Sequence, residues 1–210
     1  MTKRHFSMLR EFHLADWFTL ANAFCGTGAI FASMRFLQEG ATQDHGVRDL
    51  LIGMALIPLA FVFDALDGRI ARWRKVASTL GRELDSLSDV ISFGVAPAAL
   101  GYACGLQGGW DWLVLSYFVG CGVSRLARYN VTAEQLSGAE GKVRYFEGTP
   151  IPTSVVIVGL LAWATLSGNI GHDLWFGMLT LGPWQLHPLV LVYALSGSLM
   201  ISKTLHIPKP

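Results

Sequence analysis

Residues 64–89 read DALDGRIARWRKVASTLGRELDSLSD, and they join the end of one long apolar run to the start of the next. Two acids, Asp64 and Asp67, stand near the end of the first run, and two more, Asp85 and Asp89, stand at the start of the second. Residues three or four apart share one face of an α-helix, so each pair is expected to point the same way. If the two helices are neighbours, the stretch predicts four carboxylates that converge on one site.

Four carboxylates packed together at the edge of a bilayer need positive charge among them, because a charge in low dielectric must be paired or must bind metal. Carboxylate oxygens suit Mg²⁺, Mn²⁺ or Ca²⁺, and the sequence has no Cys/His cluster that would favour a softer metal. A pair of Mg²⁺ or Mn²⁺ ions is the usual arrangement for displacement at phosphorus. The alternative is a structural cluster of ion pairs with the neighbouring basic residues Arg69, Arg72, Arg74 and Lys75.

The stretch resembles the signature of the CDP-alcohol phosphotransferases, D-x2-D-G-x2-A-R-x8-G-x3-D-x3-D. Every fixed position is filled, by Asp64, Asp67, Gly68, Ala71, Arg72, Gly81, Asp85 and Asp89. The resemblance implies transfer of a phosphatidyl group from a CDP-linked lipid to an alcohol, with release of CMP. It also implies a site with two ions of Mg²⁺ or Mn²⁺, held by Asp64, Asp67, Asp85 and Asp89, in which Asp89 is also the general base.

The resemblance further implies a surface for CDP on which small residues let the nucleotide lie against the backbone and an arginine meets a phosphate. Two polar residues of the first apolar run are expected to face the same site. The predicted CDP-binding set is Thr19, Asn22, Asp67, Gly68, Ala71, Arg72 and Gly81.

Three further stretches, residues 85–97, 125–131 and 145–154, resemble the phosphatidylserine synthases within this family, although Ser88 stands where a small Ala is more usual there. The substrates expected from this resemblance are CDP-diacylglycerol and L-serine. Serine is a zwitterion, so its site should offer a cation for the carboxylate and an acceptor for the ammonium group. The residues predicted to hold the acceptor or the lipid phosphate are Arg125, Arg128, Asn130 and Glu147.

Three other functions fit parts of the pattern. Inositol phosphate or glycerol phosphate could replace serine as the acceptor, although a phosphorylated acceptor would favour a denser cationic pocket. An intramembrane prenyltransferase also binds Mg²⁺ and diphosphate through Asp-x3-Asp pairs, but its early helix resembles Asn-x3-Asp-x3-Asp. A cation transporter would place its acids near the middle of the bilayer, whereas these acids lie at helix ends beside a basic loop.

The composition is that of an integral membrane protein, because 52% of the 210 residues are apolar and only 15% are charged. We expect an all-α fold in one domain over residues 1–210, with an amphipathic interfacial helix at 1–13 and a bundle of six transmembrane helices over 17–203. The predicted spans are residues 17–37, 50–72, 84–106, 110–123, 151–166 and 187–201, with polar segments at 73–83 and 124–150.

The distribution of Lys and Arg predicts the orientation, since positive loops stay in the cytosol. With a cytosolic N-terminus, every Lys and Arg except Arg35 and Arg48 falls on the cytosolic side. The acids and both termini are therefore expected at the cytosolic face, with the tryptophans of residues 110–112 and 175–184 near the opposite interface. Interfaces rich in Gly and Ser also make a homodimer plausible.

The cysteines Cys25, Cys104 and Cys121 all lie in apolar runs and are expected to be buried free thiols. The histidines are scattered and predict neither a metal site nor a catalytic triad. His187, which precedes Pro188, is interpreted as an interfacial residue.

Overall fold

The computed structural model describes residues 14–39, 44–74, 79–137, 145–202 and 206–208. Within these ranges it describes the backbone alone at residues 44, 71–74, 79, 132–137, 145–147 and 206–208. The expected interfacial helix at 1–13 lies outside the described residues.

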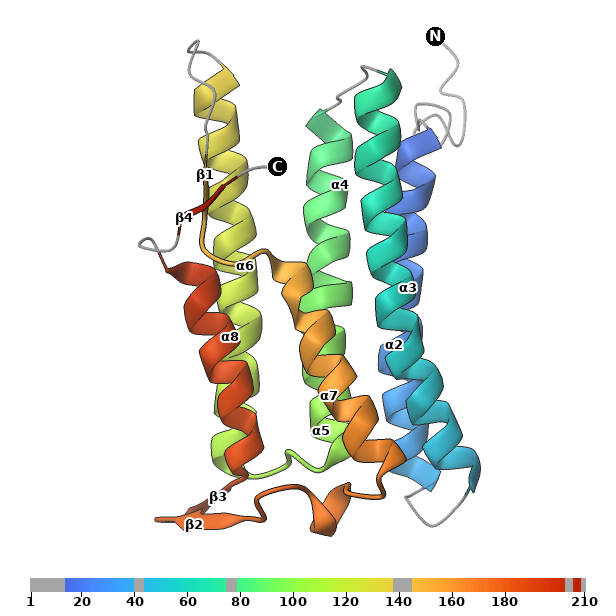
Figure 1. The fold of residues 1–210 in the computed structure, drawn as a ribbon, viewed down its shortest axis with the longest axis vertical. Helices are drawn as coiled ribbons and strands as arrows, with labels where there is room; N and C mark the ends of the chain where they lie inside the picture. The colour runs from blue at the N-terminus through green and yellow to red at the C-terminus, as the bar shows by residue number, and fades with distance from the viewer. Residues whose placement is uncertain (1–13, 40–43, 75–78, 138–144, 203–205, 209–210) are drawn as a thin grey trace, which may run out of the picture.

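Helices run up and down the long axis of the molecule and form an elongated bundle (Figure 1). The long helices are α2 (Leu14–Glu39), α3 (Asp44–Arg74), α4 (Thr79–Asp89), α5 (Ala96–Cys104), α6 (Gly109–Ser137), α7 (Ser154–Leu166) and α8 (Leu191–Ile201). A π-helix, η1 (Val90–Val95), joins α4 to α5, and the 3₁₀ turns are η2 (Ile151–Thr153), η3 (Gly171–Asp173) and η4 (Pro188–Val190). The described part of the chain is therefore mostly helical, as expected.

Four short strands form two antiparallel ribbons that the all-helical expectation did not include. One ribbon pairs β1 (Tyr145–Glu147) with β4 (His206–Pro208), and the other pairs β2 (Leu179–Leu181) with β3 (Trp184–Leu186). We call the end of the bundle where α2 begins, α3 ends and α4 begins the acid end. The end that carries β2 and β3 is the hairpin end (Figure 1).

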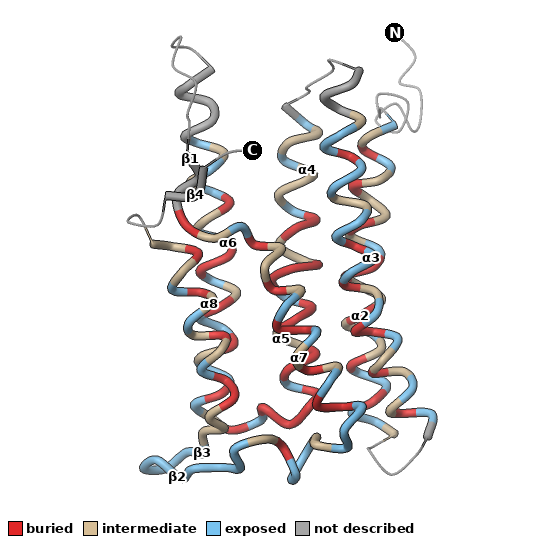
Figure 2. Tube along the Cα trace, in the orientation of Figure 1, coloured by how far each residue is buried: buried red, intermediate tan, exposed pale blue. Residues whose placement is uncertain are grey.

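Three helical segments are long and apolar enough to cross a bilayer: Leu14–Glu39, His45–Ile70 and Leu80–Cys104. The helices Ile151–Leu166 and Pro188–Ile201 are apolar but shorter. Large apolar side chains such as Phe24 and Val156 are about three-quarters exposed, and Figure 2 shows exposed positions alternating with buried ones along each helix. Such an apolar outer surface suits lipid contact. The structure thus agrees with an integral membrane protein, whereas the count of six spans stays a prediction.

One predicted loop is too long. The segment 73–83 is expected to be a loop, but α3 extends to Arg74 and α4 already begins at Thr79, so Gly81 is helical. The helix α6 likewise continues beyond the predicted span 110–123, through Arg125, Arg128 and Asn130, and ends at Ser137. Apolar content marks the part of a helix inside the bilayer, and residues of adequate helix propensity such as Arg, Leu, Ala, Glu and Gln extend it beyond.

Small residues allow α2 to pack closely against its neighbours. A Cβ atom on Gly26 would lie 2.7 Å from the Cα atom of Ser92 in η1, and one on Gly53 would lie 3.2 Å from the carbonyl oxygen of Ala29. Close approach through small residues is the usual way for helices to associate in a membrane. This packing brings α2 against both helices that carry the acids.

At the hairpin end, a buried acid joins the start of α6 to the segment before η4 through hydrogen bonds. Asp111, at the start of α6, has no exposed surface, and its carboxylate accepts hydrogen bonds of 2.8 Å from the backbone N–H groups of Gly108 and His187. The ring Nδ1 of His187 contacts the same carboxylate. His187 is therefore a structural partner of Asp111, which the interpretation as an interfacial residue missed.

Tryptophans also gather at the hairpin end. Trp110 packs edge-to-face on Trp184, with ring centroids 5.2 Å apart, and its indole N–H donates to the carbonyl of Leu181. Trp163 packs in the same manner against Trp175. The tryptophans thus lie at the end of the bundle opposite the acids, as predicted.

The three cysteines are buried and free, which confirms that prediction. Cys104 lies 4.0 Å from the hydroxyl of Thr165, in the interior between α5 and α7. The thiols therefore act as small core residues.

Candidate active site

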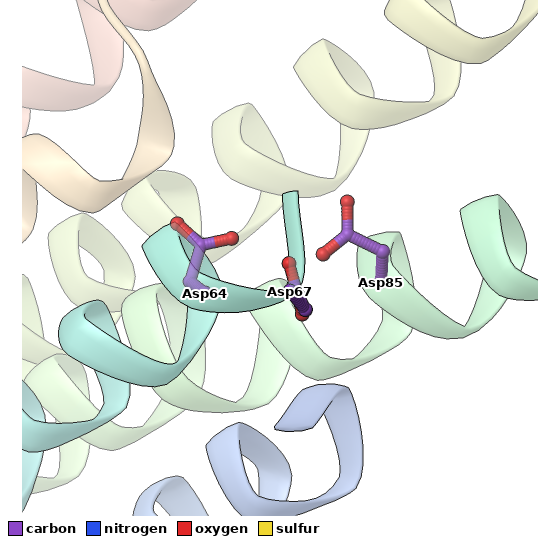
Figure 3. Close-up of side chains that lie close together, drawn as sticks. All are labelled: Asp64, Asp67 and Asp85. Atoms are coloured by element: carbon purple, nitrogen blue, oxygen red, sulfur yellow. The ribbon is translucent and has the colours of Figure 1, made fainter. Parts of the chain in front are cut away.

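The two halves of the acidic stretch meet at the acid end. One carboxylate oxygen from each of Asp64, Asp67 and Asp85 lies within 4.8 Å of the other two. Figure 3 shows the carboxylates of Asp64 and Asp85 on either side of Asp67, with two of the acids on α3 and one on α4. The predicted convergence of acids from neighbouring helices is therefore observed for three of the four.

Asp89 lies one helical turn further along α4 and is 7% exposed. It is close enough to Asp64 and Asp85 to interact with them electrostatically, and Arg125 of α6 interacts with it in the same way. The fourth acid thus lies near the group of three and also interacts with a cation of α6.

The helix changes its winding directly after Asp89. In η1 the backbone N–H of Ala96 reaches the carbonyl of Ile91, five residues earlier, instead of the usual four. Pro97 follows at once and has no N–H to give to the carbonyl four residues before it, which explains why the regular α-helical pattern fails here. Single π-turns occur often at functional sites, and this one begins directly after Asp89, the last acid of the signature.

Two polar side chains of α2 donate hydrogen bonds to the acids. Thr19 Oγ1 lies 2.8 Å from Asp67 Oδ2, and Asn22 Nδ2 lies 3.2 Å from Asp89 Oδ1. Both donors are buried. Thr19 and Asn22 therefore face the site, as expected, and their observed contacts are with its acids.

The site has more buried acceptors than donors. Asp85 Oδ1 and Asn22 Oδ1 are buried and have no hydrogen-bond partner among the described residues. The alternative of a structural salt-bridge cluster depends mainly on Arg72, Arg74 and Lys75, whose side chains lie outside the described residues, so the structure does not test it. An unmet buried acceptor is costly, and an all-oxygen set with excess negative charge is what Mg²⁺ or Mn²⁺ prefers. The residues present therefore fit a divalent cation.

The small residues of the signature leave space beside the acids. Gly68 is exposed, and a Cβ placed on it would meet no described heavy atom within 4 Å. Its small size is thus not required by packing within the described chain. Gly81 is half-buried in α4. The side chains of Ala71 and Arg72 lie outside the described residues.

The predicted acceptor residues of α6 have different surroundings. Arg125 and Arg128 are both half-buried, and the Nε of Arg125 has no hydrogen-bond partner within the described part of the chain. Asn130 instead exchanges hydrogen bonds with Ser86 of α4, at 3.0 Å, and donates weakly to Glu83 at 3.4 Å. Arg125 thus interacts electrostatically with Asp89, one of the acids of the signature.

Glu147 was also predicted to contact the acceptor. Its backbone lies in β1, paired with His206 of β4, and its side chain lies outside the described residues. The structure therefore does not test its role.

Residues 12–194 match the family model described as CDP-alcohol phosphatidyltransferase. A CDP-diacylglycerol–serine O-phosphatidyltransferase of Saccharomyces cerevisiae is 44% identical over 215 residues, which cover 99% of this chain and 75% of the yeast protein. An enzyme of the same name from Mycobacterium bovis is 38% identical over 62% of this chain and 46% of its own length. The archaetidylserine synthase of Methanothermobacter thermautotrophicus is 41% identical over 49% of this chain and 42% of its own length.

Proposed function

Because the chain belongs to the CDP-alcohol phosphatidyltransferase family, we propose that it transfers the phosphatidyl group of CDP-diacylglycerol to the hydroxyl of L-serine, giving phosphatidylserine and CMP. The observation that carries the proposal is the meeting of Asp64, Asp67 and Asp85 beside the buried Asp89, in a chain that fills every position of the family signature. Serine as the acceptor is supported by the names of the relatives, and the yeast enzyme with this name aligns with 99% of the chain.

The proposed reaction is a displacement at phosphorus. Asp89 removes the proton from the serine hydroxyl, and the oxygen attacks the phosphorus that carries the diacylglycerol. The bond between that phosphorus and the oxygen bridging it to CMP breaks, and CMP leaves with the bonding electrons. Phosphatidylserine and CMP are the products, and Asp89 holds the proton until it passes to solvent or to the leaving phosphate.

Asp64, Asp67 and Asp85 would hold Mg²⁺ or Mn²⁺, with Asp89 able to share a second ion. Such an ion supplies positive charge that stabilises the diphosphate and the departing CMP. Gly68 and Gly81, with Ala71, would let the nucleotide lie against α3 and α4, and Arg72 would meet a phosphate.

Arg125 is the residue we propose for the carboxylate of serine. It carries an unmet donor, Nε, and its interaction with Asp89 puts a cation next to the proposed base. A carboxylate held there would bring the hydroxyl of the same small molecule toward Asp89. Arg128 and Glu147 stay predicted contacts of the acceptor or the lipid phosphate, whereas for Asn130 the bonds to Ser86 favour a role in joining α6 to α4.

We further propose that the acid end lies at the cytosolic face with both termini, because nearly all Lys and Arg fall on that side. One domain over residues 1–210 and assembly as a homodimer remain predictions. Labelling of single cysteines introduced at Arg69 and at exposed Asp173 from each side of sealed vesicles tests the orientation. Equal labelling of both from the same side would contradict it.

The acceptor is tested with the purified protein in detergent, supplied with CDP-diacylglycerol and Mn²⁺ or Mg²⁺. Serine, inositol, inositol phosphate and glycerol phosphate are added in separate reactions, and CMP release and the lipid product are measured. CMP and phosphatidylserine formed with serine alone are expected. Turnover with a phosphorylated acceptor in place of serine would refute the choice of serine while keeping the reaction class.

A further inference from the structure

Thr19 and Asn22 each make two hydrogen bonds to the parts of the chain that carry the acids. The Thr19 side chain donates to Asp67, and its carbonyl accepts from Ser88 Oγ at 3.0 Å. The Asn22 side chain donates to Asp89, and its carbonyl accepts from Ser92 Oγ at 2.8 Å. We call these four contacts the α2 ladder.

Every contact of the α2 ladder is buried. Thr19 and Asn22 are 3% and 0% exposed, and the two serines that reach their carbonyls are equally shielded. In this interior a hydrogen bond is less weakened by competition from water than it would be on the surface. The ladder therefore holds α2 at one register against α4 and η1, with the close contact between Gly26 and Ser92 at its lower end.

The α2 ladder supplies hydrogen-bond donors to two acids, Asp67 and Asp89, that carry the same charge and lie near each other. Asp67 and Asp89 lie on different helices, and each receives a hydrogen bond from one residue of a third helix. A hydrogen bond to one carboxylate oxygen favours one rotamer of that side chain and so fixes the direction of the carboxylate. Residues in this position around metal ligands typically change metal affinity or activity by about 10- to 100-fold when removed.

We infer that Thr19 and Asn22 are positioning residues, which hold Asp67 for the divalent cation and Asp89 for the serine hydroxyl. This inference rests on the proposed function and replaces the expectation that the two residues act as contacts of CDP. Ser88 stands where a small Ala is more usual in the sequences that this chain resembles. Its hydroxyl donates to the Thr19 carbonyl and so adds one contact to the α2 ladder.

The role of Thr19 is tested by the metal affinity of the whole protein in detergent. Thr19→Val removes the donor at similar volume, and Thr19→Ser keeps it. Thr27→Val is the matched control, since among the described residues the Thr27 hydroxyl donates to the carbonyl of Ala23 in its own helix and to no acid. Mn²⁺ binding, followed by electron paramagnetic resonance, is expected to weaken about 10- to 100-fold in Thr19→Val and to change little in the other two. Unchanged affinity in Thr19→Val would overturn the inference.

The role of Asn22 is tested by separating turnover from nucleotide binding. Asn22→Ala should lower kcat about 10- to 100-fold while the Kd for CMP stays within about twofold of the wild type. A contact of CDP would give the reverse, with weaker CMP binding and little change in kcat, and that result would overturn the inference. If Asn22→Ala does not fold, Asn22→Ser, whose hydroxyl is too short to reach Asp89, carries the same prediction.

Neither test requires that the acceptor is serine. Mn²⁺ binding in the Thr19 variants needs no acceptor, and kcat in the Asn22 variants can be measured with any acceptor that supports CMP release. Failure of the wild-type protein to release CMP with any acceptor would instead refute the proposed function.

Discussion

Both ends of the bundle contain buried carboxylates, but the protein satisfies them differently. At the hairpin end, Asp111 receives two backbone N–H groups and contacts the imidazole of His187. At the acid end, Asp85 keeps an unmet buried oxygen, and Asp89 has one side-chain donor from Asn22. A carboxylate whose hydrogen bonds are complete contributes to stability, whereas a group of carboxylates with unmet oxygens is arranged for a ligand.

The largest expected effect is the loss of the proposed base. Asp89→Asn should lower kcat by about 10² to 10⁴-fold, because the amide cannot take the hydroxyl proton. CMP binding should be retained, since the other three acids remain. CMP release and CMP affinity are measured together, with exposed Asp173→Asn as the control at the hairpin end. Near-normal turnover in Asp89→Asn would remove Asp89 as the base.

Asp111→Asn should have the opposite pattern. The amide group would direct N–H toward donors that now bond to a carboxylate, so we expect a loss of about 2–4 kcal/mol in the free energy of unfolding. The kcat of the folded fraction should stay close to that of the wild type. Unfolding in detergent micelles and CMP release are measured on the same sample. A large loss of kcat without loss of stability would show that Asp111 contributes to catalysis and not to stability alone.

Gly26→Ala tests whether the acid end depends on the close packing of α2 against η1. The added Cβ would lie 2.5 Å from Ser92 Oγ, so α2 and η1 must move apart, at an expected cost of about 1–3 kcal/mol. Because the same contact ends the α2 ladder, kcat should fall as well. Gly159→Ala, where a Cβ meets nothing within 4 Å, is the control and should be neutral or slightly stabilising. Equal behaviour of the two variants would contradict a tight contact.

The smallest expected effect is stabilisation by metal. Mn²⁺ at about 10 to 100 times its Kd should raise the free energy of unfolding by about 1.4–2.7 kcal/mol, because the ion binds the folded acids only. The rise should persist in Asp111→Asn and disappear in Asp85→Asn. Unfolding is followed with and without EDTA. A rise that survives in Asp85→Asn would mean that the ion binds elsewhere.

Much of the site could be predicted from local spacing. Asp64 and Asp67 are three residues apart and Asp85 and Asp89 four apart, which places each pair on one helix face regardless of how the helices pack. A weaker signal lies in the first apolar run, where Thr19, Asn22 and Gly26 are also three and four residues apart, which indicates one polar and small face on α2. That face is the one on which the α2 ladder forms.

Helix ends were predicted less well for a physical reason. Hydropathy reports where a helix is in contact with lipid, and α4 and α6 continue into polar residues beyond that point. The π-turn after Asp89 has a local cause in Pro97, but the missing N–H alone does not distinguish a π-turn from a kink or a helix end.

The sequence by itself determined the chemistry available to this protein: oxygen ligands spaced for one helix face, apolar runs for a membrane, and cations concentrated on one side. Only the tertiary structure decided which groups satisfy those acids. Thr19 and Asp67 are 48 residues apart, and Asp111 and His187 are 76 apart. Hydrogen bonds over such separations depend on which helices are neighbours and at what register, and this is set by the packing of the whole bundle.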